Sequence, residues 1–372
     1  MTYGMLEMHH GKSGSMNYFE GIYKGKRALI TGNTGFKGSW LGEWLTMLGA
    51  EVVGFSLENA ANQAHFDMLS PGYKTFFADI RNLEQTVQIM AQVKPDIVFH
   101  LAAQALVIDS YHSPIETYQT NVMGTLHVLE ASRLAGVSAV VVVTSDKCYE
   151  NKEWIWGYRE NDPFGGHDMY SSSKGCAEVL TQSYRSSFCN SKDGMKVASA
   201  RAGNVIGGGD FSANRIVPDL IKSVEQQTPV EIRNPLATRP WQHVLEPLSG
   251  YLLLGMNLLK KNKVDEGWNF GPSIHSNCSV EQLVSLSTAC WSEISTKNNT
   301  DPNQVHEAHL LMLDCSKANK MLHWQPIWEL KETVEHTIAW YKTWHETKRV
   351  LTKDQIIQYG QEAELKQLSW AG

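Results

Sequence analysis

Three glycines directly after a short apolar segment constrain the fold of this chain more than any other feature. The segment Ala28–Thr31 suits a buried strand, and it runs into Gly32, Gly35 and Gly38, which are spaced GxxGxxG. Apolar residues then recur at helical spacing, and a second strand follows at Val52–Phe55. Glycine allows positive φ and lets backbone N–H groups approach a phosphate at the N-terminus of a helix. The pattern predicts the βαβ unit of a Rossmann-type, doubly wound parallel α/β sheet that binds a dinucleotide.

The residue at the end of the second strand indicates which dinucleotide binds. NAD enzymes place an acid there for the ribose, and NADP enzymes place an arginine for the extra phosphate. Ser56 occupies this place, Glu58 follows two residues later, and no Arg or Lys is near. We therefore expect NAD as the cofactor.

The composition limits the classes of protein and ligand. The chain has 372 residues, 42% of them hydrophobic and 19% charged, and no apolar run long enough to span a membrane. A net charge of −6 and the lack of a Lys- or Arg-rich run argue against a nucleic-acid partner. The six cysteines are scattered without metal-ligand spacing, which favours reduced thiols in the cytoplasm and no metal site. We interpret residues 1–15, which include a His pair, as a leader outside the fold.

The end of another strand carries groups that can move protons. Val141–Thr144 suits a buried strand, and Ser145, Asp146 and Lys147 follow it. In an open parallel sheet the carboxyl ends of the strands bind the ligand, so an acid and a base lie side by side at the expected site. Asp146 could instead be an ordinary turn residue, and Lys147 could be a surface lysine or a partner that neutralises Asp146.

A tyrosine and a lysine downstream form a second candidate pair. Tyr170 and Lys174 are four residues apart, so on a helix they share one face. The ordinary pKa of tyrosine, about 10, is too high for a base at neutral pH. A neighbouring ammonium and a cationic nicotinamide would stabilise the phenolate and lower that pKa. The pair therefore suits removal of a proton from a substrate hydroxyl while hydride leaves the carbon that bears it.

Several long stretches of the chain resemble the extended short-chain dehydrogenase/reductases, and specifically the CDP-glucose 4,6-dehydratases. These stretches are TGNTGFKGSWL, TNVMGTLHVLEA, TSDKCYENKEWIWGYRENDPFGG, YSSSKGCAE, RAGNVIGGGDF and RPWQHVLEPLSGYL. The resemblance implies a Rossmann domain and a smaller C-terminal α/β domain that binds the nucleotide sugar. It further implies that CDP-glucose becomes a 4-keto-6-deoxy sugar without net redox change, so NAD stays bound through turnover.

The resemblance also implies a role for each residue of the S-D-K motif and of the helix pair. Tyr170 takes the proton from O4 of the sugar beside Lys174, and Ser145 hydrogen-bonds O4. Asp146, with a pKa raised by burial, protonates the departing O6 hydroxyl, and Lys147 is the base for the C5 proton. Epimerases carry Ser or Thr at this strand end without an acid, so Asp146 favours a dehydratase.

The same resemblance implies two sets of binding residues. The cofactor set is Gly32, Thr34, Gly35, Phe36, Gly38, Ser56, Asp79, Ile80, Leu101, Ala102, Ala103, Tyr170 and Lys174. The substrate set is Asn204, Arg215, Arg233 and Arg239, and Arg239 or Arg215 meets the diphosphate, with Arg239 favoured. Asp79 could instead cap a helix, and each Arg could form a surface ion pair. Ile108 stands where the family usually has Arg and Met169 where it usually has Pro, and the first change leaves the exact sugar open.

The resemblance finally sets expectations for organisation. We expect an NAD-binding domain over residues 16–203, to which 241–262 return, a nucleotide-sugar domain over 204–240 and 263–346, and a tail, 347–372, that the sequence does not place. Relatives pair through helices such as 115–134 and 169–188, so a homodimer or homotetramer is expected. The product would feed deoxysugars of surface polysaccharides such as lipopolysaccharide O-antigen. Two alternatives stay open: a dehydratase or epimerase of another nucleotide sugar, and a non-catalytic NAD-binding regulatory protein.

Overall fold

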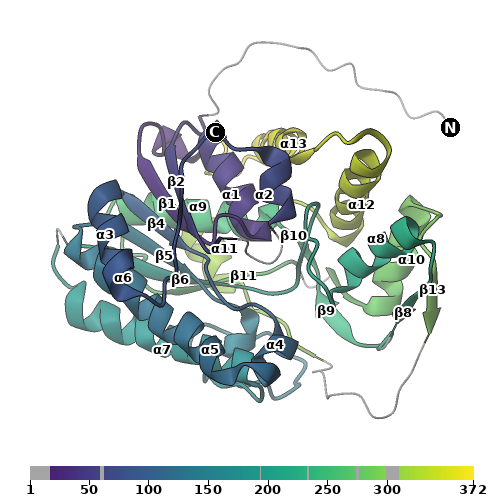
Figure 1. Ribbon diagram of the computed structural model, residues 1–372, viewed down its shortest axis with the longest axis horizontal. Coiled ribbons are helices and arrows are strands. Elements are labelled where there is room, and N and C mark those ends of the chain that lie inside the picture. Colours follow the sequence, from purple (N-terminus) through teal and green to yellow (C-terminus); the bar gives the residue numbers. More distant parts are fainter. Residues whose placement is uncertain (1–16, 59–62, 193, 233, 274–275, 299–309) are drawn as a thin grey trace.

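A seven-stranded parallel sheet forms the centre of the computed structural model, which describes residues 17–58, 63–192, 194–232, 234–273, 276–298 and 310–372 (Figure 1). The expected leader, residues 1–15, lies outside the described residues. The strand order is β11-β6-β5-β4-β1-β2-β3, and every neighbouring pair is parallel. This doubly wound order confirms the predicted fold class. The strands are β1 (Arg27–Thr31), β2 (Glu51–Ser56), β3 (Thr75–Phe77), β4 (Ile97–His100), β5 (Ala139–Val143), β6 (Lys196–Ala202) and β11 (Gly267–Phe270).

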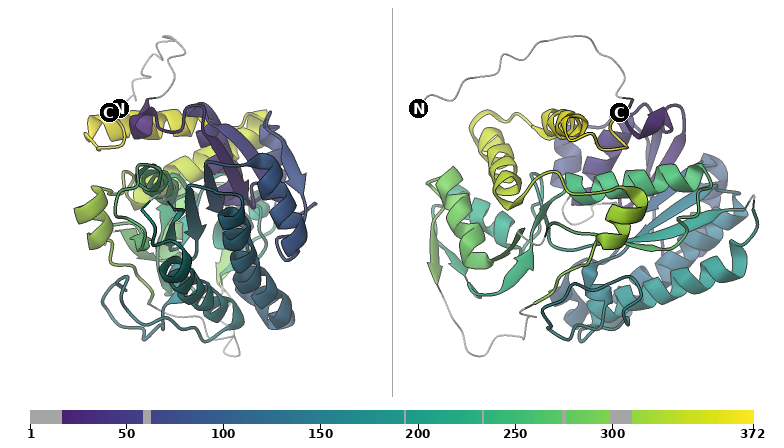
Figure 2. Two further views of the ribbon diagram at one scale, coloured as in Figure 1. Left: turned by 90° about the vertical axis from the view of Figure 1, so that its left-hand side faces the viewer. Right: turned by 180° about the vertical axis from the view of Figure 1, so that it is seen from behind.

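Helices cover both faces of this sheet (Figure 2). Along β5 the side chains alternate between two hydrophobic cores: Ala139 and Val141 pack on the side of α1 and α9, and Val140 and Val142 pack on the side of α3 and α6. Continuous apolar strands such as this one are expected in a parallel sheet that is buried on both faces. The covering helices are α1 (Phe36–Met47), α3 (Leu83–Val93), α6 (Gly124–Leu134), α7 (Met169–Phe188) and α9 (Leu245–Leu259).

A smaller part of the chain lies to one side of the sheet and contains short paired strands (Figure 1). Its elements are β7 (Val205–Ile206), α8 (Ile216–Gln226), β8 (Val230–Ile232), β9 (Thr238–Pro240), β10 (Gln242–His243), β12 (Asn277–Ser279), α10 (Val280–Cys290) and β13 (Thr296–Asn298). Strand β11 belongs instead to the main sheet, beside β6. The division into two domains stays a prediction, and we propose to count β11 with the nucleotide-binding part rather than with residues 263–346.

The tail that the sequence could not place lies against the nucleotide-binding part. After α12 (Leu330–Thr347), helix α13 (Thr352–Leu365) packs on α1. Near the end of the chain the indole of Trp370 stacks on Phe19, with ring centroids 4.9 Å apart. The tail thus supports the helix that follows the glycine turn. Among the described residues, no helix combines the length and the apolar character needed to cross a membrane.

Short elements connect these larger ones. They are η1 (Tyr18–Gly21), α2 (Ala64–Leu69), α4 (Val107–His112), α5 (Pro114–Tyr118), the π-helical η2 (Gln119–Met123), η3 (Asp146–Cys148) and α11 (Ser316–Leu322). Of these, η3 matters most for function, because it is the turn into which the S-D-K motif folds at the end of β5.

Candidate active site

The glycine turn forms a tight cradle between β1 and α1. Gly32 has a φ of +74°, and a Cβ there would lie 2.8 Å from the backbone nitrogen of Ala102. A Cβ on Gly38 would lie 2.1 Å from the Gly32 carbonyl oxygen, so only glycine lets the helix approach the turn this closely. Gly35 precedes the first residue of α1 and caps it with no side-chain acceptor. The first N–H groups of α1 are therefore available for an anion, which fits the diphosphate of a dinucleotide.

The other expected cofactor residues lie around this cradle. Ser56 ends β2, and its hydroxyl lies 2.7 Å from that of Thr34 in the glycine turn. Ile80 is buried after β3. Asp79 accepts a hydrogen bond of 2.8 Å from the backbone N–H of Arg81, and an Arg81 guanidinium nitrogen lies 2.6 Å from its carboxylate. Burial would raise the pKa of Asp79, but the hydrogen bonds and charge of Arg81 outweigh it and lower the pKa. Asp79 is therefore held as an anion by its own neighbour.

The S-D-K motif folds into a 3₁₀ turn, η3, at the carboxyl end of β5. The strand ends at Val143, so Thr144, predicted to be its last residue, lies just beyond it. Ser145 caps η3: its hydroxyl accepts the N–H of Lys147 at 3.2 Å and donates to Asp146 Oδ1 at 2.9 Å. The Lys147 side chain is partly exposed.

Asp146 is held in an environment that favours a neutral carboxyl group. Its side chain is 2% exposed, and Oδ2 has no hydrogen-bond partner in the part of the chain that the structure describes. Gly203 borders this oxygen, since a Cβ there would lie 3.1 Å from Oδ2. Burial raises the pKa of Asp146, and the nearby charges of Lys147, Arg239 and Lys37 oppose the rise without cancelling it. A carboxyl group that keeps its proton is suited to act as a general acid.

Tyr170 and Lys174 lie in the first turns of α7, as their spacing predicted. Asp168 caps this helix by accepting the N–H of Ser171 at 2.8 Å. Both candidate residues are buried, with exposures of 8% and 6%. Burial lowers the pKa of Lys174 to about 8, against the opposing charge of Glu178.

The expected lowering of the Tyr170 pKa involved both a neighbouring ammonium and a nicotinamide, and only the ammonium belongs to the chain. The chain alone does not lower it: burial raises the pKa to about 12, and the opposing contributions come from a hydrogen bond with Ser145 and from Arg215 rather than from Lys174. Spacing on a helix identified the pair but could not reveal how completely the folded chain removes water from the phenol.

Three of the four expected substrate residues, Asn204, Arg215 and Arg239, lie among the described residues. Asn204 follows β6, and Arg215 precedes α8 and donates to Asp210 Oδ2 at 2.9 Å. Arg239 lies on β9 and is near enough to lower the pKa of Asp146. Arg233 lies outside the described residues. The two departures from the family pattern are both on the surface, with Ile108 42% exposed on α4 and Met169 38% exposed at the start of α7.

The structure adds two residues that sequence reasoning missed. Lys37 lies within the glycine motif, and its Nζ is 6.0 Å from the centroid of the Tyr251 ring. Burial and the charge of Arg215 lower the pKa of Lys37 to about 7, and Asp146 opposes them. The Tyr251 hydroxyl has no hydrogen-bond partner in the described chain, and its burial raises its pKa, with smaller contributions from Tyr170 and Asp146. The position of Lys37 inside the GxxGxxG motif was a signal that could have identified it from the sequence. No feature of the sequence pointed to Tyr251.

A family comparison agrees with this arrangement. The sequence model of the family described as GDP-mannose 4,6 dehydratase matches residues 29–337. The chain belongs to this family. It is 48% identical over 348 residues to the CDP-glucose 4,6-dehydratase of Salmonella typhimurium, which covers 91% of this chain and 97% of that protein. UDP-glucuronic acid decarboxylase 1 of Xenopus tropicalis is 27% identical, over 85% of this chain and 72% of that protein. The resemblance inferred from the sequence stretches is confirmed.

Solved structures share the fold of this dehydratase-family chain. The epimerase Mth375 of Methanothermobacter thermautotrophicus has a TM-score of 0.78 at 23% identity, covering 91% of this chain and 97% of that one. MoeE5 in complex with UDP-glucose and NAD has a TM-score of 0.72 at 24% identity, covering 85% of this chain and 98% of that one. In the described residues of the present chain, no group of three or more His, Cys, Asp or Glu side chains is placed to hold a metal ion.

Proposed function

We propose that the chain catalyses the NAD-dependent intramolecular dehydration of CDP-D-glucose to CDP-4-keto-6-deoxy-D-glucose. The observation that carries the proposal is the buried acid Asp146 near the buried Tyr170 and Lys174, in a chain 48% identical to a CDP-glucose 4,6-dehydratase. A 4-epimerase has no step in which an acid expels water. A non-catalytic NAD-binding protein would need neither the tyrosine nor the lysine.

The cofactor would lie over the glycine cradle, with its diphosphate at the N-terminus of α1 and its ribose towards Ser56. When bound, NAD accepts a hydride from C4 of the sugar and returns it to C6. Beside a cationic nicotinamide, the Tyr170 phenol, whose pKa the chain alone raises to about 12, would ionise more readily. Lys174, one helical turn away, would hold the ribose hydroxyls and add a second positive charge.

Tyr170 and Ser145 would act at C4. The Tyr170 phenolate accepts the O4 proton while the C4–H bond breaks, and the Ser145 hydroxyl, which is near enough to lower the pKa of Tyr170, orients O4. The product of this step is a 4-keto group, which makes the C5–H bond acidic enough for an amine to break it.

Asp146 and Lys147 would act at C5 and C6. Lys147 as a neutral amine takes the C5 proton, Asp146 gives its proton to O6, and the C6–O6 bond breaks so that water leaves. Lys147 then returns a proton to C5 as hydride returns to C6. The proton that Tyr170 gained balances the one that Asp146 gave up, so the net change is loss of one water without oxidation or reduction.

The sugar nucleotide would be held by the loops beyond β6 and β9. Asn204, Arg215 and Arg239 are proposed to contact the diphosphate, since a guanidinium matches two phosphate oxygens at once. The hydrogen bond to Asp210 already orients Arg215. Arg239 lies near enough to Asp146 for its charge to lower the pKa of that carboxyl group. These positions would bring the glucose ring between Tyr170 and the S-D-K turn.

Exposed apolar side chains support a homodimer or homotetramer. They lie on the α5–α6 segment and on α7, the helices through which relatives of this chain pair. The residues are Ile115, Met123, Leu134, Val179 and Phe188, which are 73%, 45%, 58%, 54% and 57% exposed. Exposed apolar side chains that gather on one surface commonly mark a protein–protein interface. We further propose a cytoplasmic enzyme that supplies deoxysugars for surface polysaccharides such as lipopolysaccharide O-antigen.

The proposal is tested by incubating the purified protein and NAD with CDP-glucose, and in parallel with the UDP, GDP and dTDP sugars. A 4-keto product shows a new ultraviolet absorbance in alkali, and its mass is lower than that of the substrate by one water. Tyr170→Phe is the matched inactive control. Product from another nucleotide sugar but none from CDP-glucose would overturn the substrate, a change of configuration without mass loss would indicate an epimerase, and NAD binding without product would favour the regulatory alternative.

A further inference from the structure

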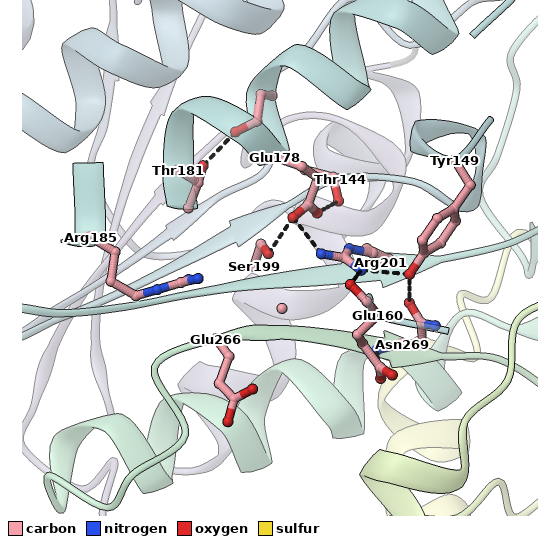
Figure 3. A network of polar contacts seen from close by, with 12 residues as sticks. Thr144, Tyr149, Glu160, Glu178, Thr181, Arg185, Ser199, Arg201, Glu266 and Asn269 are labelled. Carbon is pink, nitrogen blue, oxygen red and sulfur yellow. Dashed lines mark hydrogen bonds and ion pairs between the residues drawn. The ribbon is translucent and has the colours of Figure 1, made fainter. Parts of the chain in front are cut away.

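A buried ion pair joins α7 to β6 and contacts the residues on either side of the S-D-K turn, Thr144 and Tyr149 (Figure 3). Glu178 of α7 and Arg201 of β6 are 2% and 3% exposed, and a guanidinium nitrogen of Arg201 lies 2.8 Å from Glu178 Oε2. Burial alone would raise the pKa of Glu178, but the charge and hydrogen bond of Arg201 lower it, so the carboxylate is ionised. The roles proposed above for the catalytic side chains use neither residue.

Glu178 connects the catalytic helix to the start of the turn. It follows Tyr170 and Lys174 at intervals of four residues, so all three lie on the inner face of α7. Its carboxylate accepts the hydroxyl of Thr144, the residue immediately before Ser145, and that of Ser199 at 2.6 Å. A displacement of Glu178 would therefore move the start of the turn relative to Tyr170.

Arg201 holds the other end of the turn. Its Nη1 donates to the hydroxyl of Tyr149 at 2.5 Å and to the Glu160 carbonyl at 3.2 Å. Tyr149 is the residue directly after Cys148, where η3 ends, and its hydroxyl donates to Asn269 Oδ1 at 2.8 Å. The guanidinium carbon also lies 5.2 Å from the centroid of the Tyr149 ring.

We infer that Glu178 and Arg201 are positioning residues for the dehydration: one ion pair holds both ends of the S-D-K turn and fixes Asp146 and Lys147 against Tyr170 and Lys174. The kinetic consequences of this inference rest on the proposed function. The contacts of the ion pair with the residues at both ends of the turn are observed in the structure and do not depend on it. Removing the two charges from water is costly, and well-packed apolar residues often replace such pairs without loss of stability. Folding alone therefore gives little reason for an ion pair at this position.

The pair also acts on the charge of the catalytic lysine. Glu178 raises the pKa of Lys174 against the effect of burial, and Cys148 is the other group that raises it. The remaining charged or titratable groups around Glu178 are Arg201, Arg185 and Tyr149. Loss of the carboxylate would thus leave Lys174 neutral at a lower pH, which a purely structural role for Glu178 would not predict.

The test is the double variant Glu178→Gln with Arg201→Gln, which removes both charges together. Glu178→Gln alone would leave a buried arginine unpaired and is expected to lose folding stability for that reason. In the double variant we expect kcat for CDP-glucose to fall about 10- to 100-fold, as for catalytic groups displaced by about 1 Å, with KM little changed. The alkaline limb of the kcat/KM profile should move towards lower pH, because Glu178 raises the pKa of Lys174, whereas Arg201 is not among the groups that act on this pKa.

The matched control is Glu246→Gln, which alters another buried carboxylate far along the sequence from the turn. Glu246 is fully buried on α9 and accepts the N–H groups of Ile327 and Trp328 at 3.0 and 2.8 Å. Its variant should lose stability but keep kcat and the pH profile at a temperature where it is folded. An unchanged kcat and pH profile in the double variant, or the same changes in Glu246→Gln, would overturn the inference.

A crystal structure of the double variant separates this inference from the proposed function. We expect residues 145–148 to shift relative to Tyr170. If the turn superposes on that of the unaltered protein, the ion pair does not position it and the inference is wrong. If the unaltered protein dehydrates no nucleotide sugar, the proposed function fails, and the structural comparison still decides whether the ion pair positions the turn.

Discussion

Replacing Asp146 by asparagine tests the acid that distinguishes a dehydratase from other enzymes of this fold. Asparagine has the same shape, can accept the Ser145 hydroxyl that lies 2.9 Å from Oδ1, and cannot give a proton to O6. General acid catalysis contributes about 10²- to 10⁴-fold to a rate. At about 1.4 kcal/mol per factor of ten, loss of the acid should raise the barrier to water loss by about 3 to 5 kcal/mol.

Folding stability should not account for that loss. Burial raises the pKa of Asp146 above its unfolded value, so the protonated group stabilises the fold at low pH and this contribution disappears as the pH rises through the folded pKa. At neutral pH an ionised carboxylate would be unfavourable in this position, and asparagine never ionises. We therefore expect Asp146→Asn to unfold at a temperature no lower than that of the unaltered protein.

The assay follows the partial reactions separately. NADH absorbance reports oxidation at C4, deuterium uptake from solvent reports removal of the C5 proton, and the alkaline absorbance of the 4-keto sugar reports completed turnover. The variant should retain the first two and lose the third. Asp96→Asn is the control, because Asp96 accepts the backbone N–H of Arg27 at the start of β1, at the amino ends of the strands and so away from the candidate site. Water loss at the full rate in Asp146→Asn would refute the assignment.

Three further predictions follow from individual contacts. The kcat/KM value should fall above about pH 8, because Lys174, whose pKa burial lowers to about 8, loses its proton there, and a profile that stays flat well above this pH would contradict the role of the ammonium. Gly38→Ala should weaken NAD binding at least about tenfold by calorimetry, since its Cβ would lie 2.1 Å from the Gly32 carbonyl oxygen, and unchanged affinity would count against the cradle. Trp370→Ala should lower the free energy of unfolding in urea by about 3 to 5 kcal/mol, because the ring is 1% exposed and stacks on Phe19, while a loss below about 1 kcal/mol would show that the tail contributes little.

The elements that form the nucleotide-binding part were predictable because their signals are local. The predicted strand Ala28–Thr31 is β1 (Arg27–Thr31), and Val52–Phe55 lies within β2 (Glu51–Ser56). At the end of β5 the prediction was one residue too long: the hydroxyl of Thr144 bonds to Glu178, and no periodic pattern reports a side-chain partner on a distant helix.

Residues of the candidate site could be predicted only where they belong to a motif that is typical of one kind of chemistry. S-D-K and the Tyr170–Lys174 spacing identified groups at the end of β5 and at the start of α7, and the structure buries all of them except Lys147, which is partly exposed. Lys37 and Arg201 were missed because lysine and arginine side chains are usually solvated. The role of these two side chains depends on the groups that they contact in the folded chain. The lowered pKa expected for Tyr170 beside a nicotinamide stays a prediction, since burial in the chain alone acts in the opposite direction.

Local signals were enough to predict the doubly wound sheet, the glycine cradle and the residue types at the strand ends, because backbone conformation and the alternation of apolar side chains are set by near neighbours. The folded chain was needed to show that residues 144, 178 and 201 meet beside one turn and that the segment 347–372 packs beside α1. Contacts between distant segments leave no periodic trace in a sequence, and the ionisation of a side chain depends on water that only the assembled chain excludes.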